Sequence, residues 1–157
     1  MIRRIPQRTI DDCVICTVAM VMGSPYHYER VLAESTAFPR LNADGKHFEW
    51  WRAYLTREGF DTCYRPWSDL YQLYRYGGQV VGIVNLQSHE IRQGHAVAVD
   101  ELGIVDPCDG SPDHQDIGQY VLDRRAAGFE FISEFMAVRG HGYATAGCRG
   151  HERGPSR

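Results

Sequence analysis

The stretch that decides the fold runs from Gly94 to Pro107, with the sequence "GHAVAVDELGIVDP". Its first half is an apolar, β-branched run of strand length, "ELG" is typical of a tight turn, and "IVDP" follows as a second strand. The pattern therefore predicts an antiparallel hairpin. His95 would stand on its first strand and Asp106 at the end of its second, so the two side chains can lie close together on one face if the register allows it.

Patterns on either side of this hairpin predict the rest of the fold. Runs typical of strands lie at 79–87 and 129–139. The first half of the chain instead shows apolar residues at helical spacing, with Gly59 placed as a C-terminal cap and Ser68 as an N-cap. Helices are expected at 13–22, 26–35, 47–57 and from residue 68 onward. The predicted fold class is α+β, an N-terminal helical half packed on a C-terminal antiparallel sheet.

Composition narrows the class of protein. The chain has 157 residues, of which 43% are hydrophobic, as is typical of one globular domain. We expect a single domain over residues 1–139 and a flexible tail over 140–157, because the last stretch is rich in Gly and Arg and has no apolar periodicity. The formal charge of −3 and the scattered basic residues do not favour a nucleic-acid partner. No run is apolar enough for a membrane span or a signal peptide, so no membrane partner is expected and the predicted location is the cytoplasm.

The chain contains five cysteines: Cys13, Cys16, Cys63, Cys108 and Cys148. An odd number of cysteines in a chain without an export signal favours reduced thiols over a disulfide framework. Cys63 and Cys108 are expected to be packing residues, the usual role of an unpaired cysteine, although Cys108 lies two residues from Asp106.

Cys13 is the cysteine with a candidate chemical role. It follows Asp11 and Asp12 in "QRTIDDCVICTVAMVM" (7–22), and either aspartate could cap a helix that begins at Cys13. A thiol at a helix N-terminus is activated when its pKa falls below the ordinary value of about 8.5. Because the run is rich in β-branched residues, a buried strand is an alternative to the helix.

Cys13 and Cys16 also form a C-x-x-C pair. A zinc site would need a second such pair, and a thioredoxin-like redox site would normally follow a strand; the sequence shows neither. Cys16 is therefore expected to be a packed neighbour of Cys13.

A thiol nucleophile also needs a base and an oxyanion donor. His95 begins a buried-looking strand, where a polar ring is costly unless its nitrogens have partners, and Asp106 is the candidate orienting group. Gln7 lies six residues before Cys13, close enough for its amide to stabilise an oxyanion beside the thiol. The predicted site therefore consists of Gln7, Cys13, His95 and Asp106.

In type and order, these residues resemble the site of the papain-like cysteine peptidases, most closely the branch of bacteriocin leader peptidases that cut after a double glycine. The stretches "QRTIDDCVICTVAM" and "GGQVVGIVNLQSHEIRQGHAVAVDELGIVDPCDG" show the resemblance, which covers residues 7–139 in order and spacing. It implies a papain-like fold. Gln7 would be the oxyanion residue and Cys13 the nucleophile. His95 would be the base, and Asp106 would orient it.

Two features depart from the family's pattern. Val14 follows the cysteine, where the family usually has a small residue, and its branched side chain is expected to narrow the approach to the thiol. Leader peptidases are also commonly fused to an ABC transporter, whereas this sequence shows neither membrane segments nor an ATPase. The resemblance therefore predicts a fold and a chemistry but no particular substrate.

The function implied by the resemblance is that of a bacterial or phage cysteine peptidase, a thiol hydrolase that cleaves an amide bond in a peptide or protein substrate. No metal and no organic cofactor are expected. Two alternatives remain open: acyl transfer to an amine by the same residues, and a non-catalytic binding module on the same scaffold. The sequence does not indicate an oligomeric state.

Overall fold

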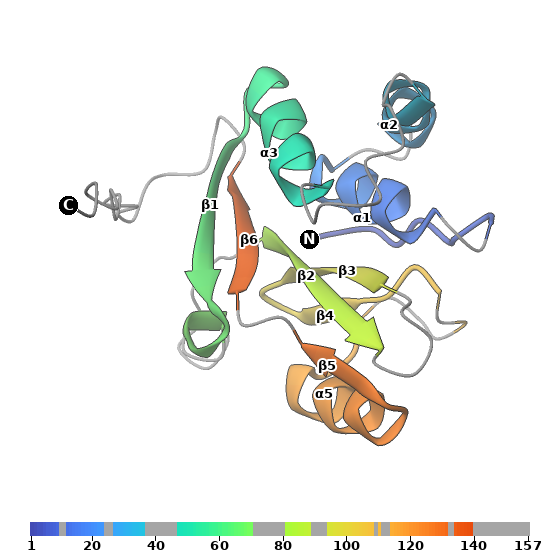
Figure 1. Ribbon diagram of the computed structural model, residues 1–157, viewed down its shortest axis with the longest axis vertical. Helices are drawn as coiled ribbons and strands as arrows, with labels where there is room; N and C mark the ends of the chain where they lie inside the picture. The colour runs from blue at the N-terminus through green and yellow to red at the C-terminus, as the bar shows by residue number, and fades with distance from the viewer. Residues whose placement is uncertain are drawn as a thin grey trace.

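The computed structural model describes residues 1–9, 12–23, 27–36, 47–70, 81–88, 94–108, 110, 114–131 and 134–139. Its helices are α1 (Cys13–Val21), α2 (His27–Thr36), α3 (His47–Arg57) and α5 (Ile117–Ala126). Its strands are β1 (Asp61–Pro66), β2 (Val81–Ser88), β3 (Gly94–Asp100), β4 (Gly103–Val105), β5 (Phe129–Phe131) and β6 (Glu134–Arg139). The chain is therefore a mixed α+β protein (Figure 1), and the predicted tail over 140–157 lies outside the described residues.

Strands β1 to β6 form one antiparallel sheet in the order β1-β6-β2-β3-β4, with β5 paired to β2. The predicted hairpin is its β3–β4 pair. Asp100 pairs with Gly103 across the turn, and the Asp100 Oδ1 accepts a hydrogen bond of 2.9 Å from the Leu102 N–H. Gly103 has a φ of +135°, and a Cβ there would lie 2.2 Å from the carbonyl oxygen of Gln115, so glycine is required at this position.

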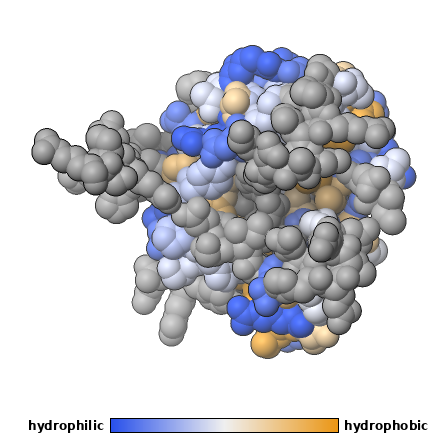
Figure 2. Space-filling view, viewed as in Figure 1, coloured by the Kyte–Doolittle hydropathy of each residue, from blue (hydrophilic) through white to orange (hydrophobic). Residues whose placement is uncertain are grey.

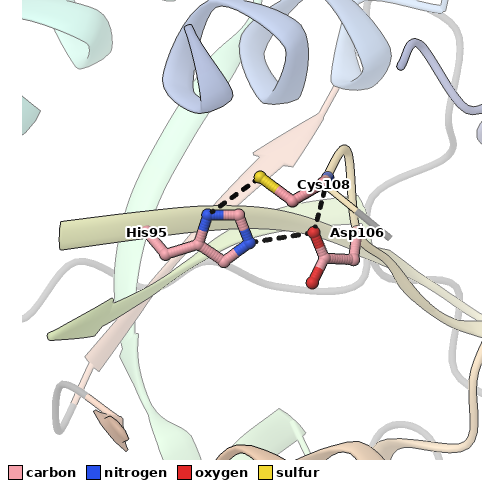
Figure 3. Close-up of side chains that lie close together, drawn as sticks. All are labelled: His95, Asp106 and Cys108. Carbon is pink, nitrogen blue, oxygen red and sulfur yellow. Dashed lines mark hydrogen bonds and ion pairs between the residues drawn. The ribbon is translucent and has the colours of Figure 1, made fainter. Parts of the chain in front are cut away.

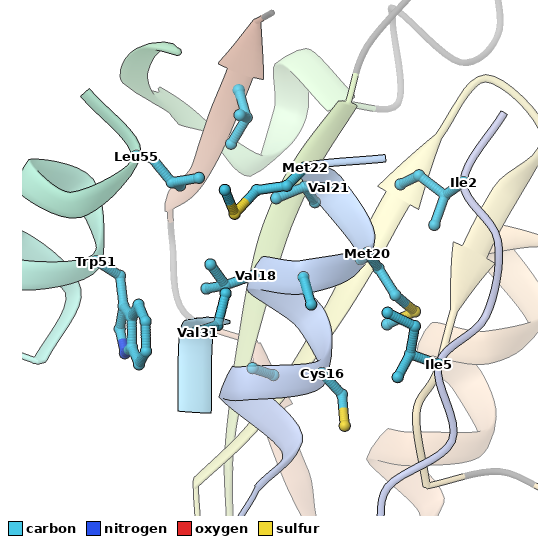
Figure 4. Close-up of a cluster of buried hydrophobic side chains, with 14 of the residues drawn as sticks. Ile2, Ile5, Cys16, Val18, Met20, Val21, Met22, Val31, Trp51 and Leu55 are labelled. Carbon is cyan, nitrogen blue, oxygen red and sulfur yellow. The ribbon is translucent and has the colours of Figure 1, made fainter. Parts of the chain in front are cut away.

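Helices cover both faces of the sheet (Figure 1). Ala96 and Ala98 of β3 belong to a core cluster with α1, α2 and α3, part of which is drawn in Figure 4. Val97 and Val99 alternate with them and pack in a second cluster against α5. Both faces of β3 are thus buried, which explains why its sequence is a continuous apolar run.

Two elements were not predicted and change the predicted layout. Strand β1 lies before the hairpin in sequence and pairs with β6, and helix α5 lies between β4 and β5. Asp116 caps α5 by accepting a hydrogen bond of 2.9 Å from the Gln119 N–H, and Gly128 follows its end with a φ of +82°. The strand predicted at 129–139 is in fact two strands, because β5 pairs with β2 whereas β6 pairs with β1 and β2. The structure therefore differs from the expected division into a helical first half and a sheet in the second half, because β1 lies before the hairpin and α5 after it.

Helix ends agree with the sequence patterns in one case and differ in another. Gly59 follows α3 with a φ of +88°, and the Phe60 N–H donates to the carbonyl oxygen of Leu55, which is the expected glycine C-cap. The next helix begins at Trp67, one residue before the predicted N-cap Ser68, and its continuation beyond residue 70 lies outside the described residues.

Helix α1 begins at Cys13, as predicted, but not through a side-chain cap. Asp12 precedes it and makes no capping hydrogen bond. The Asp12 Oδ2 instead accepts hydrogen bonds from the Arg8 N–H (3.0 Å) and the Tyr28 hydroxyl (2.7 Å). Since α1 is a poor helix former by composition, burial of its side chains stabilises it; Cys16 and Val18 are fully buried.

Most large apolar side chains of the described residues lie in the two core clusters. On the face drawn in Figure 2, hydrophilic and hydrophobic residues are interspersed among the coloured atoms. Among the described residues, the exposed large hydrophobic side chains are Met1, Leu102 and Leu122. None of the described helices has the length and hydrophobicity that a membrane span requires.

One buried hydrogen bond fixes α1 against β3. The Thr17 hydroxyl donates to the carbonyl oxygen of Ala96 over 2.9 Å, and the Thr17 side chain is fully buried. Thr17 lies one helical turn after Cys13, and Ala96 directly follows His95. This bond therefore determines how the start of α1 sits relative to the start of β3.

Replacing this threonine tests the anchor. Thr17→Val keeps the shape of the side chain but removes the donor, and we expect the free energy of unfolding to fall by about 1 to 3 kcal/mol. Urea denaturation measures the change. The matched control is Thr36→Val, because the exposed Thr36 hydroxyl donates to the carbonyl oxygen of Ala33 within its own helix. Equal effects of the two substitutions would contradict the assigned role of Thr17.

Candidate active site

Gln7, Cys13 and His95, three of the four predicted site residues, line one cleft. It has a volume of about 540 Å³ and is also lined by Cys108. His95 comes from the start of β3 and Cys13 from the first turn of α1, whereas Gln7 lies in the N-terminal segment before α1. Asp106, the fourth predicted residue, is buried and contacts His95 (Figure 3).

The register of the hairpin explains which residues meet His95. Ala98 pairs with Val105, and the same register continued beyond β4 places Cys108 opposite His95 and Asp106 diagonal to it. His95 Nε2 lies 2.9 Å from Asp106 Oδ1, and its Nδ1 lies 3.7 Å from the Cys108 sulfur. The ring is therefore held between a carboxylate on one side and a thiol on the other (Figure 3).

The Asp106 carboxylate is surrounded by donors. Besides His95, its Oδ1 accepts from the Cys108 N–H at 2.8 Å, while its Oδ2 accepts from the Tyr120 hydroxyl at 2.5 Å and from the Arg124 guanidinium at 2.6 Å. Burial by itself raises the pKa of Asp106, but the bonds to these groups outweigh it and hold the pKa below the ordinary value. Asp106 is thus an ionised carboxylate with every oxygen engaged.

His95 carries a positive charge at neutral pH. Burial by itself lowers its pKa, yet hydrogen bonds to Asp106 and to Cys13 raise the pKa from 6.5 to about 9. Since the pKa in the folded protein lies above the unfolded value, the charged ring contributes to stability fully below pH 6.5, and this contribution is lost as the pH rises through about 9.

Cys13 has the surroundings of a nucleophile. It is the first residue of α1, where the backbone N–H groups have no partners within the helix, and its side chain lies close enough to His95 to raise the pKa of that ring. Cys13 is 8% exposed, and it lines the cleft. Val14, which was expected to narrow the approach to the thiol, packs against the core and is not among the described residues that line the cleft.

Cys108 is not a packing residue, contrary to expectation. Cys108 is exposed, and its thiol donates a hydrogen bond to the Oε1 of Gln7. The backbone N–H of Gln7 in turn donates to the carbonyl oxygen of Pro107 over 3.0 Å. Partial burial, together with the negative charge of Asp106, raises the pKa of the Cys108 thiol to about 12. Cys108 is therefore a neutral thiol at physiological pH, and it holds the acceptor end of the Gln7 amide.

Cys16 is separate from this chemistry. It is fully buried, its sulfur lies 3.7 Å from the carbonyl oxygen of Pro6, and burial raises its pKa to about 12. It is a packed neighbour of Cys13, as expected.

Helix α5 contributes two site residues that sequence reasoning missed. Tyr120 and Arg124 lie one turn apart on the same helix face, and both bind the Oδ2 of Asp106. The available signal was the helical pattern that starts at the capping residue Asp116. Arg4 was missed as well; it donates to the carbonyl oxygens of Asp106 (2.9 Å) and Pro107 (3.3 Å) and so fastens the N-terminal segment beside the site.

Comparison with known proteins found no family model, no curated protein and no solved structure that matches this chain. Its function must therefore be inferred from the residues of the site.

The raised pKa of His95 can be measured directly. We expect the titration midpoint of the His95 ring, followed by NMR in the presence of a chelator, to lie near 9. Asp106→Asn removes the carboxylate charge, so the midpoint should fall by about 1 to 3 pH units. Tyr120→Phe is the control because it retains that charge, and its midpoint should stay near 9. An unchanged midpoint in a folded Asp106→Asn variant would show that Asp106 does not raise the pKa of the His95 ring.

Proposed function

We propose that this protein is a papain-like thiol hydrolase that cleaves a peptide bond or another amide bond. The observation that supports it most is the position of His95, between the buried carboxylate of Asp106 and the thiol of Cys13 at the start of α1. A thiol beside an imidazolium and a helix N-terminus is stabilised as a thiolate, which is the nucleophilic form.

In the proposed reaction, the Cys13 thiolate attacks the carbonyl carbon of the scissile amide. The His95 imidazolium then gives its Nδ1 proton to the leaving amine, and Asp106 holds the ring through Nε2. Water, deprotonated by the now neutral His95, hydrolyses the acyl enzyme; the acid product leaves, and the Cys13 thiolate and the His95 imidazolium are restored. This sequence of steps needs no metal or organic cofactor.

Gln7 and the backbone N–H of Cys13 are the proposed oxyanion donors. The contact with Cys108 occupies the Oε1 of Gln7, which leaves its NH₂ group as the donor. The hydrogen bond between the Gln7 N–H and Pro107 fixes this segment to the loop that carries Asp106. Both donors therefore belong to segments that the fold holds beside His95.

Cys13, rather than Cys108, is the proposed nucleophile. Both thiols contact His95, but Cys108 belongs to the segment that follows β4 and not to the first turn of a helix, and its raised pKa keeps it protonated. A protonated thiol is a weak nucleophile.

Alkylation tests this assignment without knowledge of the substrate. At neutral pH we expect iodoacetamide to label Cys13 faster than Cys63 or Cys108, because only Cys13 has both an imidazolium and a helix N-terminus beside it. Mass spectrometry of partially labelled peptides gives the rate for each cysteine. His95→Ala should slow the labelling of Cys13 and leave that of Cys63 unchanged. If Cys13 reacts no faster than Cys63, the mechanism is wrong and the scaffold is better explained as a binding module.

Hydrolysis itself can be assayed with a library of fluorogenic peptide amides. Cys13→Ala should abolish cleavage, whereas Cys63→Ala, which changes a β1 residue outside the cleft, should retain it. Product analysis with and without an added amine separates hydrolysis from acyl transfer, because hydrolysis needs only water as the acceptor.

The role of Gln7 has its own test. Gln7→Met removes the NH₂ donor without adding a charge that would itself change the reactivity of the Cys13 thiol, so kcat/KM should fall by about 10² to 10³. The rate of Cys13 alkylation should stay close to that of the unsubstituted protein, since this reaction forms no oxyanion. A loss of alkylation as large as the loss of hydrolysis would mean that Gln7 only positions Cys13.

A further inference from the structure

Three side chains of the cleft form a set that zinc prefers. His95 and Cys108 lie in contact, and Cys13 hydrogen-bonds with the same His95 ring. Thiolate sulfur and imidazole nitrogen are the usual zinc ligands in proteins, and two cysteines with one histidine form a known catalytic-type set that leaves a fourth position open. Among the described residues, the group whose possible ligand atoms all lie within 4.8 Å of one another is His95, Asp106 and Cys108. Cys13 is outside this group, so its side chain would have to move toward Cys108 to join a metal bound there.

The spacing of two of these ligands suits a bound metal. In a tetrahedral site with a Zn–S bond of about 2.3 Å and a Zn–N bond of about 2.05 Å, the sulfur and the nitrogen lie about 3.6 Å apart. The Cys108 sulfur and the His95 Nδ1 are separated by 3.7 Å. Zinc could therefore bind both atoms with little movement of either side chain.

Asp106 would orient the site and would not be a ligand. Its two oxygens already accept hydrogen bonds from His95, Tyr120 and Arg124 and from the backbone of Cys108. A histidine that ligates a metal through one ring nitrogen commonly donates its other N–H to a carboxylate, which fixes the ring and increases its basicity. His95 already has this arrangement, with Nε2 on Asp106 and Nδ1 facing the thiol.

We propose that Cys13, Cys108 and His95 form a zinc site that reversibly switches off the thiol chemistry of the cleft; the inhibitory role, though not the binding, rests on the proposed hydrolase function. Zn²⁺ would bind two thiolates and the neutral imidazole, and the protons of the Cys108 thiol and of the His95 imidazolium would pass to solvent. The metal would occupy the Cys13 sulfur and the Nδ1 of His95, the two atoms that the reaction requires. The fourth position would face the cleft and hold water.

Metal binding is measured on the reduced, chelator-treated full chain. Titration with Co²⁺ should give thiolate-to-cobalt charge-transfer absorption and the strong ligand-field bands of a tetrahedral site, at one equivalent per chain. Competition with Zn²⁺ should remove both signals. Cys108→Ala should weaken zinc binding by about tenfold or more, comparable to the effects of losing supporting groups around metal sites. Cys63→Ala is the matched control and should bind like the unsubstituted chain. Absence of the charge-transfer band, or equal zinc affinity in Cys108→Ala, would overturn the site.

Inhibition is measured separately, as the ratio of Cys13 alkylation rates with and without zinc for each variant. The rate with zinc divided by the rate without zinc should be far below one for the unsubstituted chain and for Cys63→Ala. At the same zinc concentration it should be much closer to one for Cys108→Ala. If Cys13 is reactive but zinc does not protect it, the regulatory proposal fails and the hydrolase proposal stands. If Cys13 is unreactive without metal, the hydrolase proposal fails, while the cobalt spectra still decide whether the metal site exists.

Discussion

The site depends on the hydrogen bonds that surround the buried carboxylate of Asp106. A buried charge is strongly unfavourable unless donors surround it, and here the donors come from β3, from α5 and from the backbone that follows β4. Satisfying one carboxylate therefore brings together three parts of the chain. His95 is thereby charged and oriented, while Tyr120 and Arg124 hold α5 against the hairpin. Loss of any donor leaves part of a buried charge without compensation, so the site and the fold are coupled at this residue.

A second constraint is the alternation of β3 between two cores. Its even-numbered alanines face α1 and its odd-numbered valines face α5, so a shift of one residue would exchange small and large side chains on both faces. The register is therefore strongly specified. The bond from Thr17 to Ala96 adds a polar restraint between α1 and β3, next to the point where Cys13 and His95 meet. The thiol and the imidazole are thus positioned by rigid elements.

The local patterns predicted much of this arrangement. The hairpin, the helix beginning at Cys13 and the glycine cap at Gly59 follow from turn residues and periodicity that are short in range. Cys108 was missed although the turn of the hairpin implies it: a register that pairs Asp100 with Gly103 also brings residue 108 opposite residue 95. Tyr120 and Arg124 were missed for another reason, because no local pattern indicates that a helix face will contact a carboxylate elsewhere. The side chain of Asp12 likewise bonds to Tyr28 in place of capping α1, a tertiary contact that overrides a local preference.

The N-terminal segment that bears Gln7 has no helix or strand of its own, and distant groups hold it. The Ile2 N–H donates to Asp100, 98 residues away, and Arg4 donates to the carbonyl of Asp106, 102 residues away. This segment therefore has no partners for these bonds until the hairpin has formed. Its position depends on tertiary contacts alone, so opening of the hairpin would also release Gln7 from the cleft that it lines.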